Sequence, residues 1–247
     1  MPDAAATRAK WGVIIPSTNT VVEHDLNQVR PRGITFHAGR LYIETADLSS
    51  DSAFEALLEQ IRHSMSIAIR DVMTAEPDYL VMGMSAETFW GGKSGLTQFK
   101  QEVTDQAGLS IATGAEACER AVEALGLRKI AVLTPYQPVG DEQVCSFFGE
   151  LGVDVVRIHG LRCQSATAIA EVTEADLRPI LRELDGTDID AIVQAGTNLS
   201  MLRLADEAER WLDKPVVGIN AATLWYALRA NGFADQFDGF GCLLRDH

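Results

Sequence analysis

Small hydrogen-bonding side chains gather where the predicted strands of this chain end. They are Ser17, Thr18, Asn19, Ser85, Thr113, Thr134, Tyr136, Thr197, Asn198, Ser200 and Asn220. In open parallel sheets, ligands bind beyond the carboxyl ends of the strands. Hydroxyl and amide donors fixed there stabilise negative charge that develops during a reaction. The sequence therefore predicts a site that holds a small anion through neutral donors.

One of these turns also carries a carboxylate. Glu87 follows the predicted strand 78–82 and lies among Met84, Phe89 and Trp90. A carboxylate half-buried in such surroundings has a raised pKa and could act as a general base near neutral pH. The alternative is an ordinary acid in the first turn of a helix, where the helix dipole favours it. Phe89 and Trp90 are expected either to form an apolar lid or to pack against the preceding helix.

The chain contains an internal repeat, with matching residues in its two halves. The aligned pairs are Asp78 and Asp190, Val81 and Val193, Ser85 and Thr197, Ala115 and Ala221, Ala121 and Ala227, Ala124 and Ala230, and Gly126 and Gly232. The repeat predicts two copies of one α/β unit. If the copies face each other, their two turns line one cleft.

Short apolar runs alternate with amphipathic stretches along both halves. Strands are predicted at 11–15, 33–43, 78–82, 109–113, 128–134, 153–159, 190–195, 215–219 and 239–244, the last returning to the first half. Helices are predicted at 52–75, 94–107, 115–126, 141–151, 173–184 and 223–231. A further helix is predicted to begin at Val21, and another to end at Trp211. This alternation predicts parallel sheets covered by helices on both faces. We expect one domain at 10–114 with 223–247, and a second at 115–222.

Two predicted helix starts carry the capping-box pattern, Thr20 with Glu23 and Thr113 with Glu116. A third predicted helix has Thr173-Glu-Ala-Asp176 at its start. In such a box the side chains satisfy the first N–H groups of the helix. A loop that leads into a helix start also suits an anion.

Composition limits the class of partner. The chain has 247 residues, 47% hydrophobic and 23% charged, and a formal net charge of −14. This charge repels nucleic acid and anionic lipid. No apolar run approaches the roughly 20 residues of a membrane span, and we expect a cytoplasmic protein.

The four cysteines do not have the spacing of a metal site or a disulfide framework. Cys118 and Cys145 are expected in the core, whereas Cys163 could enter the cleft from its own loop. No dinucleotide, P-loop or zinc-protease motif occurs. His37 and Arg40 could reach a substrate carboxylate from the second strand, or form surface or interface salt bridges.

Four turns together resemble the aspartate/glutamate racemase superfamily, and more closely its maleate cis-trans isomerase and arylmalonate decarboxylase branch. They are Pro16-Ser-Thr-Asn-Thr20, Met82-Gly-Met-Ser85, Thr134-Pro-Tyr136 and Gln194-Ala-Gly196. The resemblance spans residues 11–245. It implies two flavodoxin-like, Rossmann-like α/β domains related by a pseudo-two-fold axis, with the active site between them, no cofactor and no metal. A homodimer or higher homo-oligomer is usual for such proteins.

The resemblance also implies roles for particular residues. Ser17, Thr18 and Asn19 would bind a carboxylate, Ser85 and the amide of Ala86 would hold an enediolate-like oxygen, and Tyr136 would donate a phenolic hydrogen bond. The family places one cysteine in each domain. Here these positions fall at Gly83 or Met84 and at Ala195 or Gly196, next to Thr197 and Asn198. Both family thiols are therefore expected to be missing.

The leading hypothesis is a cofactor-independent isomerase or decarboxylase that acts on a small carboxylate through an enediolate-like intermediate. In this hypothesis Ser85, Glu87 and Tyr136 are the catalytic residues. One alternative is a carboxylate-binding protein that has lost catalysis together with its thiols. Another is a hydrolase of a lactone or amide that uses Glu87 to activate water.

Overall fold

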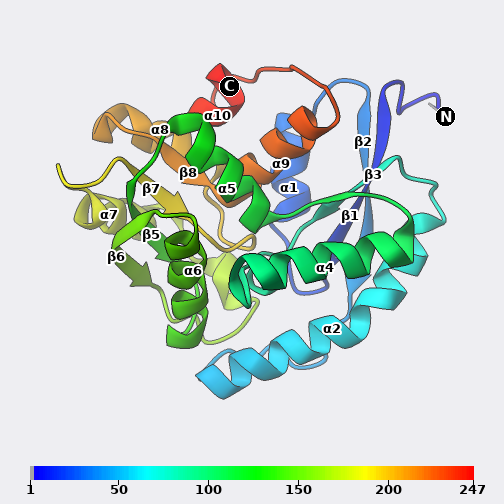
Figure 1. Cartoon of the computed structure of the whole chain (residues 1–247), viewed down its shortest axis with the longest axis horizontal. Helices are drawn as coiled ribbons and strands as arrows, with labels where there is room; N and C mark the ends of the chain where they lie inside the picture. The colour runs from blue at the N-terminus through cyan, green and yellow to red at the C-terminus, as the bar shows by residue number, and fades with distance from the viewer. Residues whose placement is uncertain (1–2) are drawn as a thin grey trace.

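The computed structural model describes residues 3–247 and contains two parallel four-stranded sheets, the first on the right of Figure 1 and the second on the left. The first sheet has the order β2-β1-β3-β4, and its strands are β1 (Ala9–Pro16), β2 (Ile34–Leu41), β3 (Tyr79–Met82) and β4 (Ile111–Ala112). The second has the order β6-β5-β7-β8, and its strands are β5 (Lys129–Thr134), β6 (Asp154–Gly160), β7 (Ala191–Gln194) and β8 (Val216–Gly218). Both sheets therefore have the same topology, and the predicted α/β fold class is confirmed.

Helices connect the strands and cover the sheets (Figure 1). In the first half they are α1 (Val22–Val29), α2 (Asp51–Met73), α3 (Ala86–Phe89), α4 (Gly92–Ala107) and α5 (Gly114–Leu125). In the second they are α6 (Pro138–Glu150), the 3-10 turn η1 (Ala168–Glu171), α7 (Glu174–Leu184), α8 (Leu202–Leu212), α9 (Ile219–Ala230) and α10 (Cys242–Asp246). Within residues 3–247, no helix is both long and apolar enough to cross a membrane.

The internal repeat is visible in matching hydrogen bonds. The Asp78 amide donates to Lys10 O at 2.8 Å, and the Asp190 amide donates to Lys129 O at 2.7 Å. Each carboxylate in turn accepts a backbone N–H from the neighbouring strand, from Lys10 in one half and from Lys129 in the other. The two aligned aspartates therefore begin equivalent central strands in the two sheets.

Of the two predicted capping boxes, the one at α5 is partly present, and a further box occurs at α7. Thr173 and Asp176 form a complete capping box at α7. At α5, the Thr113 side chain accepts from the Glu116 amide at 3.2 Å. The Glu116 carboxylate pairs instead with Lys100, at 2.5 Å, so this cap is only half of a box.

The prediction that Thr20 caps the first helix is wrong. Helix α1 begins at Val22 and has no cap from Thr20. The Asn19 side chain accepts from the amides of Val21 and Val22, at 3.0 Å each. Asn19 takes this place because the preceding strand ends at Pro16 and the turn closes at once, with the Asn19 amide on Pro16 O at 2.9 Å.

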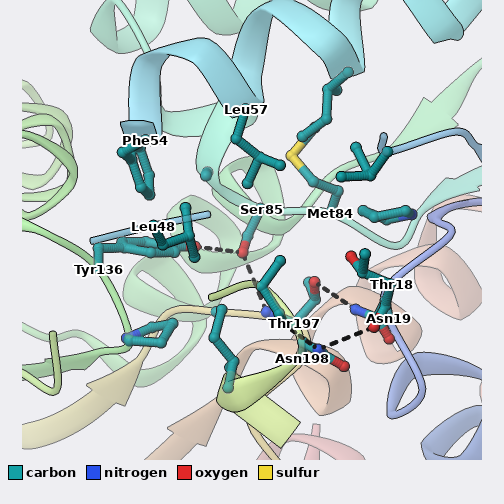
Figure 2. Close-up of a pocket in the computed structure, with 18 of the residues that line it drawn as sticks. Thr18, Asn19, Leu48, Phe54, Leu57, Met84, Ser85, Tyr136, Thr197 and Asn198 are labelled. Atoms are coloured by element: carbon teal, nitrogen blue, oxygen red, sulfur yellow. Dashed lines mark hydrogen bonds between the residues drawn. The ribbon is translucent and has the colours of Figure 1, made fainter. Parts of the chain in front are cut away.

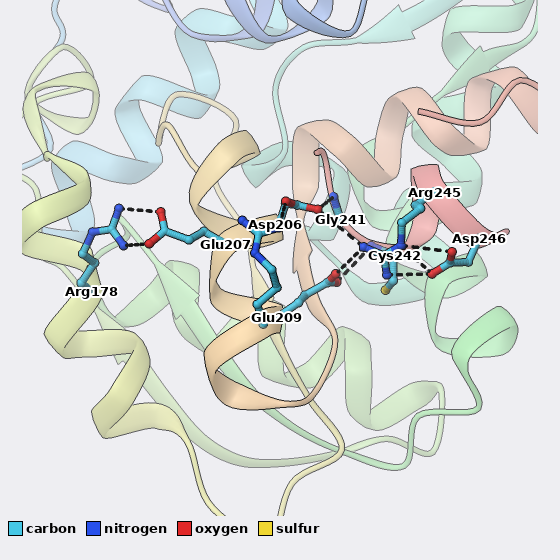
Figure 3. Close-up of polar contacts among 9 residues, drawn as sticks. Arg178, Asp206, Glu207, Glu209, Gly241, Cys242, Arg245 and Asp246 are labelled. Atoms are coloured by element: carbon cyan, nitrogen blue, oxygen red, sulfur yellow. Dashed lines mark hydrogen bonds and ion pairs between the residues drawn. The ribbon is translucent and has the colours of Figure 1, made fainter. Parts of the chain in front are cut away.

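The predicted strand at 239–244 is also wrong, because this segment ends in helix α10. Gly239 and Gly241 have φ angles of 83° and 93°, which interrupt an extended chain. Figure 3 shows how α10 is held on α8: Asp206 accepts the Gly241 amide at 3.2 Å, and Glu209 accepts the Cys242 amide at 3.1 Å. Two carboxylates of α8 therefore satisfy N–H groups at the start of α10.

Helix α9 leaves the second sheet and packs against β3 and β4 of the first, and against α1 and α5. This crossing is the contact expected if residues 223–247 belong to the first domain. We propose the boundaries given by the sequence, 10–114 with 223–247 and 115–222.

Candidate functional site

A pocket of about 60 Å³ lies where the carboxyl ends of strands from both sheets meet (Figure 2). Pro16 is the last residue of β1, whereas Ser85 follows β3, Tyr136 follows β5 and Thr197 follows β7. The polar residues that line it are Thr18, Asn19, Ser85, Tyr136, Thr197 and Asn198. The volume has room for several water molecules or part of a small ligand. The turns of the two halves therefore do face one another.

Three donors converge in this pocket, as Figure 2 shows. Ser85 Oγ lies 2.7 Å from Tyr136 Oη, and the Thr197 amide donates to Ser85 Oγ at 3.3 Å. The bond between the two hydroxyls uses one of their two hydrogens. The second hydrogen is left to donate to a ligand. Ser85 and Thr197, which align in the repeat, are thus in direct contact.

The turn that carries Thr197 is fixed from both sides. Thr197 Oγ1 donates to Gly83 O at 3.0 Å and accepts from Asn19 Nδ2 at 3.3 Å. Asn220 Nδ2 donates to Thr197 O at 3.0 Å and to Asp25 Oδ2 at 2.8 Å. The Thr197 amide is therefore preorganised, which is the condition for electrostatic stabilisation of a developing charge.

Two asparagines that line the pocket are hydrogen-bonded within the protein. The Asn198 side chain accepts the Thr20 amide at 3.0 Å and donates to Ala166 O at 2.8 Å. Asn19 is occupied by the α1 amides and by Thr197. The side-chain amides of Asn19 and Asn198 therefore already have partners within the protein. Their hydrogen bonds hold the turns that form the pocket in place.

The rest of the lining is apolar, and of its residues only Met84, Ala86 and Gly196 were predicted as part of the site. It consists of Pro16, Ile43, Leu48, Phe54, Leu57, Leu58, Ile61, Met84, Ala86, Pro135, Ala166, Ile169 and Gly196. Four of these come from the first half of α2, on the apolar stripe that the sequence pattern did reveal. None of the residues that line the pocket carries a charge. The site therefore combines one donor cluster with an apolar wall.

Tyr136 remains a neutral phenol in this environment. Its side chain is 5% exposed, and burial raises its pKa, while the hydrogen bond with Ser85 opposes the shift. A protonated hydroxyl can donate to an anionic ligand at neutral pH. Tyr136 is therefore suited to hydrogen-bond donation.

Glu87 lies outside the pocket. Its carboxylate receives two hydrogen bonds from Arg62, from Nε at 2.7 Å and from Nη2 at 3.0 Å. Burial raises its pKa, as the sequence suggested, and Arg62 opposes the shift. Glu87 lines a separate groove between α2, α3 and α4, because the short helix α3 turns its side chain towards Arg62. The observed geometry gives no support to its predicted role as a base.

The expected aromatic lid is not built from Phe89 and Trp90. Phe89 is fully buried and packs edge-on against Phe147, with ring centroids 5.2 Å apart. Trp90 stacks on Phe54 at 6.3 Å and borders the outer groove. Trp90 therefore packs against the preceding helix, α2, as the second expectation had it, whereas Phe89 packs against the later helix α6.

Three other candidate binding residues do not line the pocket. Ser17 Oγ accepts the Ile43 amide at 3.0 Å. The Ala195 amide donates to Leu133 O at 2.9 Å. Gly83 offers its carbonyl to Thr197. The other candidate binding residues, Thr18, Asn19, Met84, Ala86, Gly196, Thr197 and Asn198, line the pocket.

None of the four cysteines lines the pocket. Cys118 is in the core as predicted, Cys163 is also buried in the core, and Cys145 is only half-buried. A Cβ atom on Gly83 would lie 2.9 Å from Ile15 Cγ1, and one on Gly196 would lie 2.5 Å from Pro135 Cδ. Neither glycine could carry a thiol without movement of its neighbours.

The two basic candidates of the second strand have structural partners. Arg40 pairs with Glu23 and donates to Asn19 O at 2.9 Å. His37 is hydrogen-bonded to Thr35 at 2.8 Å. Neither side chain lines the pocket, and Arg40 forms the salt bridge that was the alternative expectation.

Comparison with known proteins places the chain in a family. The family model described as arylmalonate decarboxylase matches residues 11–244. The chain belongs to the arylmalonate decarboxylase family. It is 25% identical over 242 residues to a maleate isomerase of Pseudomonas putida, covering 94% of this chain and 96% of that protein. It is 26% identical over 238 residues to an arylmalonate decarboxylase of Bordetella bronchiseptica, covering 94% and 95%.

Solved structures of family members have the same fold. Nocardia farcinica maleate cis-trans isomerase, in a mutant with a covalently bound succinylcysteine intermediate, superposes with a TM-score of 0.87 at 21% identity, covering 96% of this chain and 98% of that one. A double mutant of arylmalonate decarboxylase in the liganded form superposes with a TM-score of 0.83 at 22% identity, covering 96% of this chain and 99% of that one. The similar proteins are isomerases and decarboxylases, so an enzyme of this general kind is supported.

Proposed function

We propose that this protein is a cofactor-independent enzyme that acts on a small carboxylate with an apolar substituent, through an enediolate-like intermediate. The observation that carries the proposal is the cluster of Ser85, Tyr136 and the Thr197 amide beside an apolar wall. Decarboxylation is the preferred reaction, and isomerisation is the second.

The cluster suits an intermediate that gains negative charge on oxygen. One hydroxyl hydrogen of the Ser85–Tyr136 pair is free to donate, and the Thr197 amide lies next to it. Such donors bind the intermediate more strongly than the substrate because the charge on oxygen increases during the reaction.

The apolar wall favours loss of carbon dioxide. A carboxylate pressed against Phe54, Leu57 and Leu58 would lose its hydration and find no cation, because within residues 3–247 no charged residue lines the pocket. Carbon dioxide is neutral, so its formation relieves this penalty. A substrate that is held by one carboxylate at the donor cluster, with a second near the wall, fits this arrangement.

The electron pair left on carbon must take up one proton. Ordinary phenols have a pKa near 10, so Tyr136 is the most acidic of the side chains that line the pocket, even though burial raises its pKa. We assign this proton to the Tyr136 hydroxyl, which regains it from solvent. The Nocardia isomerase is described with a succinylcysteine intermediate; here the reaction would proceed without the two family cysteines.

The test is a substrate screen with single variants. Phenylmalonate, alkylmalonates and maleate would be followed by carbon dioxide release and by proton NMR in D₂O. Tyr136→Phe and Ser85→Ala should each lower the rate on the true substrate by at least tenfold, and by about 100 to 1,000-fold if one donor of an oxyanion site is lost.

Tyr226→Phe is the matched control for this screen, because Tyr226 is only half-buried and lies on α9 outside the pocket. It should leave the rate unchanged. Wild-type rates in both Tyr136→Phe and Ser85→Ala would overturn the proposed role of the donor cluster.

A binding protein without catalysis is the second candidate. It is favoured by the absence of a cysteine among the residues that line the pocket. A ligand that raises the melting temperature without turnover, and without deuterium exchange at its α-carbon, would support binding alone. Exchange at that carbon would identify an enzyme.

A further inference from the structure

Arg162 lies behind the turn that carries Tyr136. Its Nη1 atom donates to the Tyr136 carbonyl and forms an ion pair with Asp141 Oδ2 at 2.6 Å. Asp141 also accepts from the Thr134 hydroxyl, and Thr134 Oγ1 accepts the Tyr136 amide at 3.2 Å. Both the amide and the carbonyl of Tyr136 are therefore held by one network of three side chains.

The local backbone is adapted to this network. Arg162 has a φ of 54°, in the left-handed region that non-glycine residues rarely occupy. A Cβ atom on Gly160 would lie 2.1 Å from Arg162 Nη1 and 2.5 Å from Asp141 Oδ2, so only glycine leaves room for the ion pair. Strain of this kind concentrates near functional sites.

The first half contains the same arrangement at the equivalent turn. Arg40 pairs with Glu23 on α1 and donates to Asn19 O at 2.9 Å and to Pro16 O at 3.3 Å. In each half, the arginine lies on the second strand or just after it. It donates a hydrogen bond to a carbonyl of the turn after the first strand, and it forms an ion pair with an acid on the helix that follows this turn. The two halves reach this contact with different acids and different turn residues.

We propose that Arg162 is a positioning residue that sets the orientation of the Tyr136 hydroxyl through the backbone of its turn. Arg162 does not line the pocket, so it acts on a ligand only through Tyr136. The effect on turnover rests on the proposed function, whereas the effect on Tyr136 itself does not.

The chain has four tyrosines, which makes the hydroxyl of Tyr136 observable. Protein labelled with ¹³C at tyrosine Cζ should give four resonances, and Tyr136→Phe assigns the one of interest. Arg162→Met should shift the Tyr136 resonance by more than its linewidth and leave the other three in place. Free guanidinium at millimolar concentration should restore the resonance in Arg162→Ala, because the Arg162 side chain is 40% exposed.

Arg157→Met is the matched control, because Arg157 on β6 makes the same kind of contact away from the pocket. It donates to Leu184 O at 2.8 Å and pairs with Asp188 at 2.5 Å. This variant should leave the Tyr136 resonance unchanged. If Arg162→Met does not fold, Arg162→Lys keeps the charge without the planar fork and should still shift the resonance.

An unchanged Tyr136 resonance in a folded Arg162 variant would overturn the proposal. With a substrate in hand, Arg162→Met should lower kcat about tenfold with little change in KM. If the wild-type protein turns over none of the acids, the proposed function fails while the NMR result still decides the role of Arg162.

Discussion

The two halves share one frame but contribute differently to the pocket. In the first half, the turn after β1 places Thr18 in the pocket, and helix α2 supplies Phe54 and Ile61 to the wall. In the second half, the turn after β5 places Tyr136 at the pocket. The first half thus provides most of the apolar wall of the pocket, and the second half provides the phenol group of Tyr136. Duplication of a fold gives two equivalent sets of strand ends, and the side chains placed there decide which of them does chemistry.

The two turns that meet in the pocket also differ in their backbone. Gly196 has a φ of 123°, whereas Gly83, in the matching turn, does not have a left-handed conformation. The second turn therefore depends on a backbone conformation that residues other than glycine rarely adopt, whereas the first does not.

Replacing these glycines should give the largest effect on stability. Gly196→Ala combines an unfavourable φ with a Cβ contact of 2.5 Å to Pro135, and it should lower the free energy of unfolding by about 2 to 5 kcal/mol. Gly83→Ala should cost less, about 1 to 3 kcal/mol, because its nearest contact is the Ile15 side chain at 2.9 Å, which can shift. Urea unfolding of both variants measures the difference, and equal losses would remove the asymmetry.

Each half also buries a carboxylate on its first helix, with different partners. Asp141 on α6 has Arg162 and Thr134. Asp25 on α1 has only Asn220, and its Oδ1 atom has no hydrogen-bond partner within residues 3–247. Burial raises the pKa of Asp25 to about 6, against an ordinary value of 3.8.

Asp25→Asn should therefore stabilise the protein at pH 7 by about 1 to 3 kcal/mol. The folded state binds this proton more tightly than the unfolded state, so the stability from Asp25 is complete below pH 3.8 and is lost as the pH rises through 6. Asp141→Asn should give no gain, because it removes the partner of Arg162. Thermal unfolding from pH 4 to 7 tests this, and a variant with no pH-dependent difference from the wild type would contradict the assignment.

The aligned aspartates at the start of β3 and β7 should show the smallest difference. Asp190 accepts backbone N–H groups of both Arg128 and Lys129, at 2.8 Å each, whereas Asp78 accepts only that of Lys10. Asp190→Ala should lower the free energy of unfolding by about 1 to 2 kcal/mol and Asp78→Ala by about half of that.

The Asp190 effect should also depend on pH. The backbone amides of Lys129 and Arg128 hold the pKa of Asp190 below its usual range. Its contribution is therefore present above the ordinary pKa of an aspartate and is lost as the pH falls through the lowered value. Equal losses in Asp190→Ala and Asp78→Ala at pH 7 would show that the second hydrogen bond contributes nothing.

The sequence by itself determined the repeated architecture and most of the polar pocket. Alternating strands and helices predicted the sheets because periodicity records which face of each element is buried. The alignment of Ser85 with Thr197 predicted one shared cleft if the two copies face each other, and the direct contact of these residues shows that the two turns do meet.

Only the tertiary structure decided which side chains turn into the pocket. The stripe of Phe54, Leu57, Leu58 and Ile61 has the same pattern whether it meets a packed core or a cavity, so its part in the wall could not be read from spacing. Glu87 follows Ser85 by two residues, yet its orientation depends on Arg62 of α2, 25 positions earlier. Sequence patterns encode local faces, whereas the pocket is set by contacts between segments far apart in the chain.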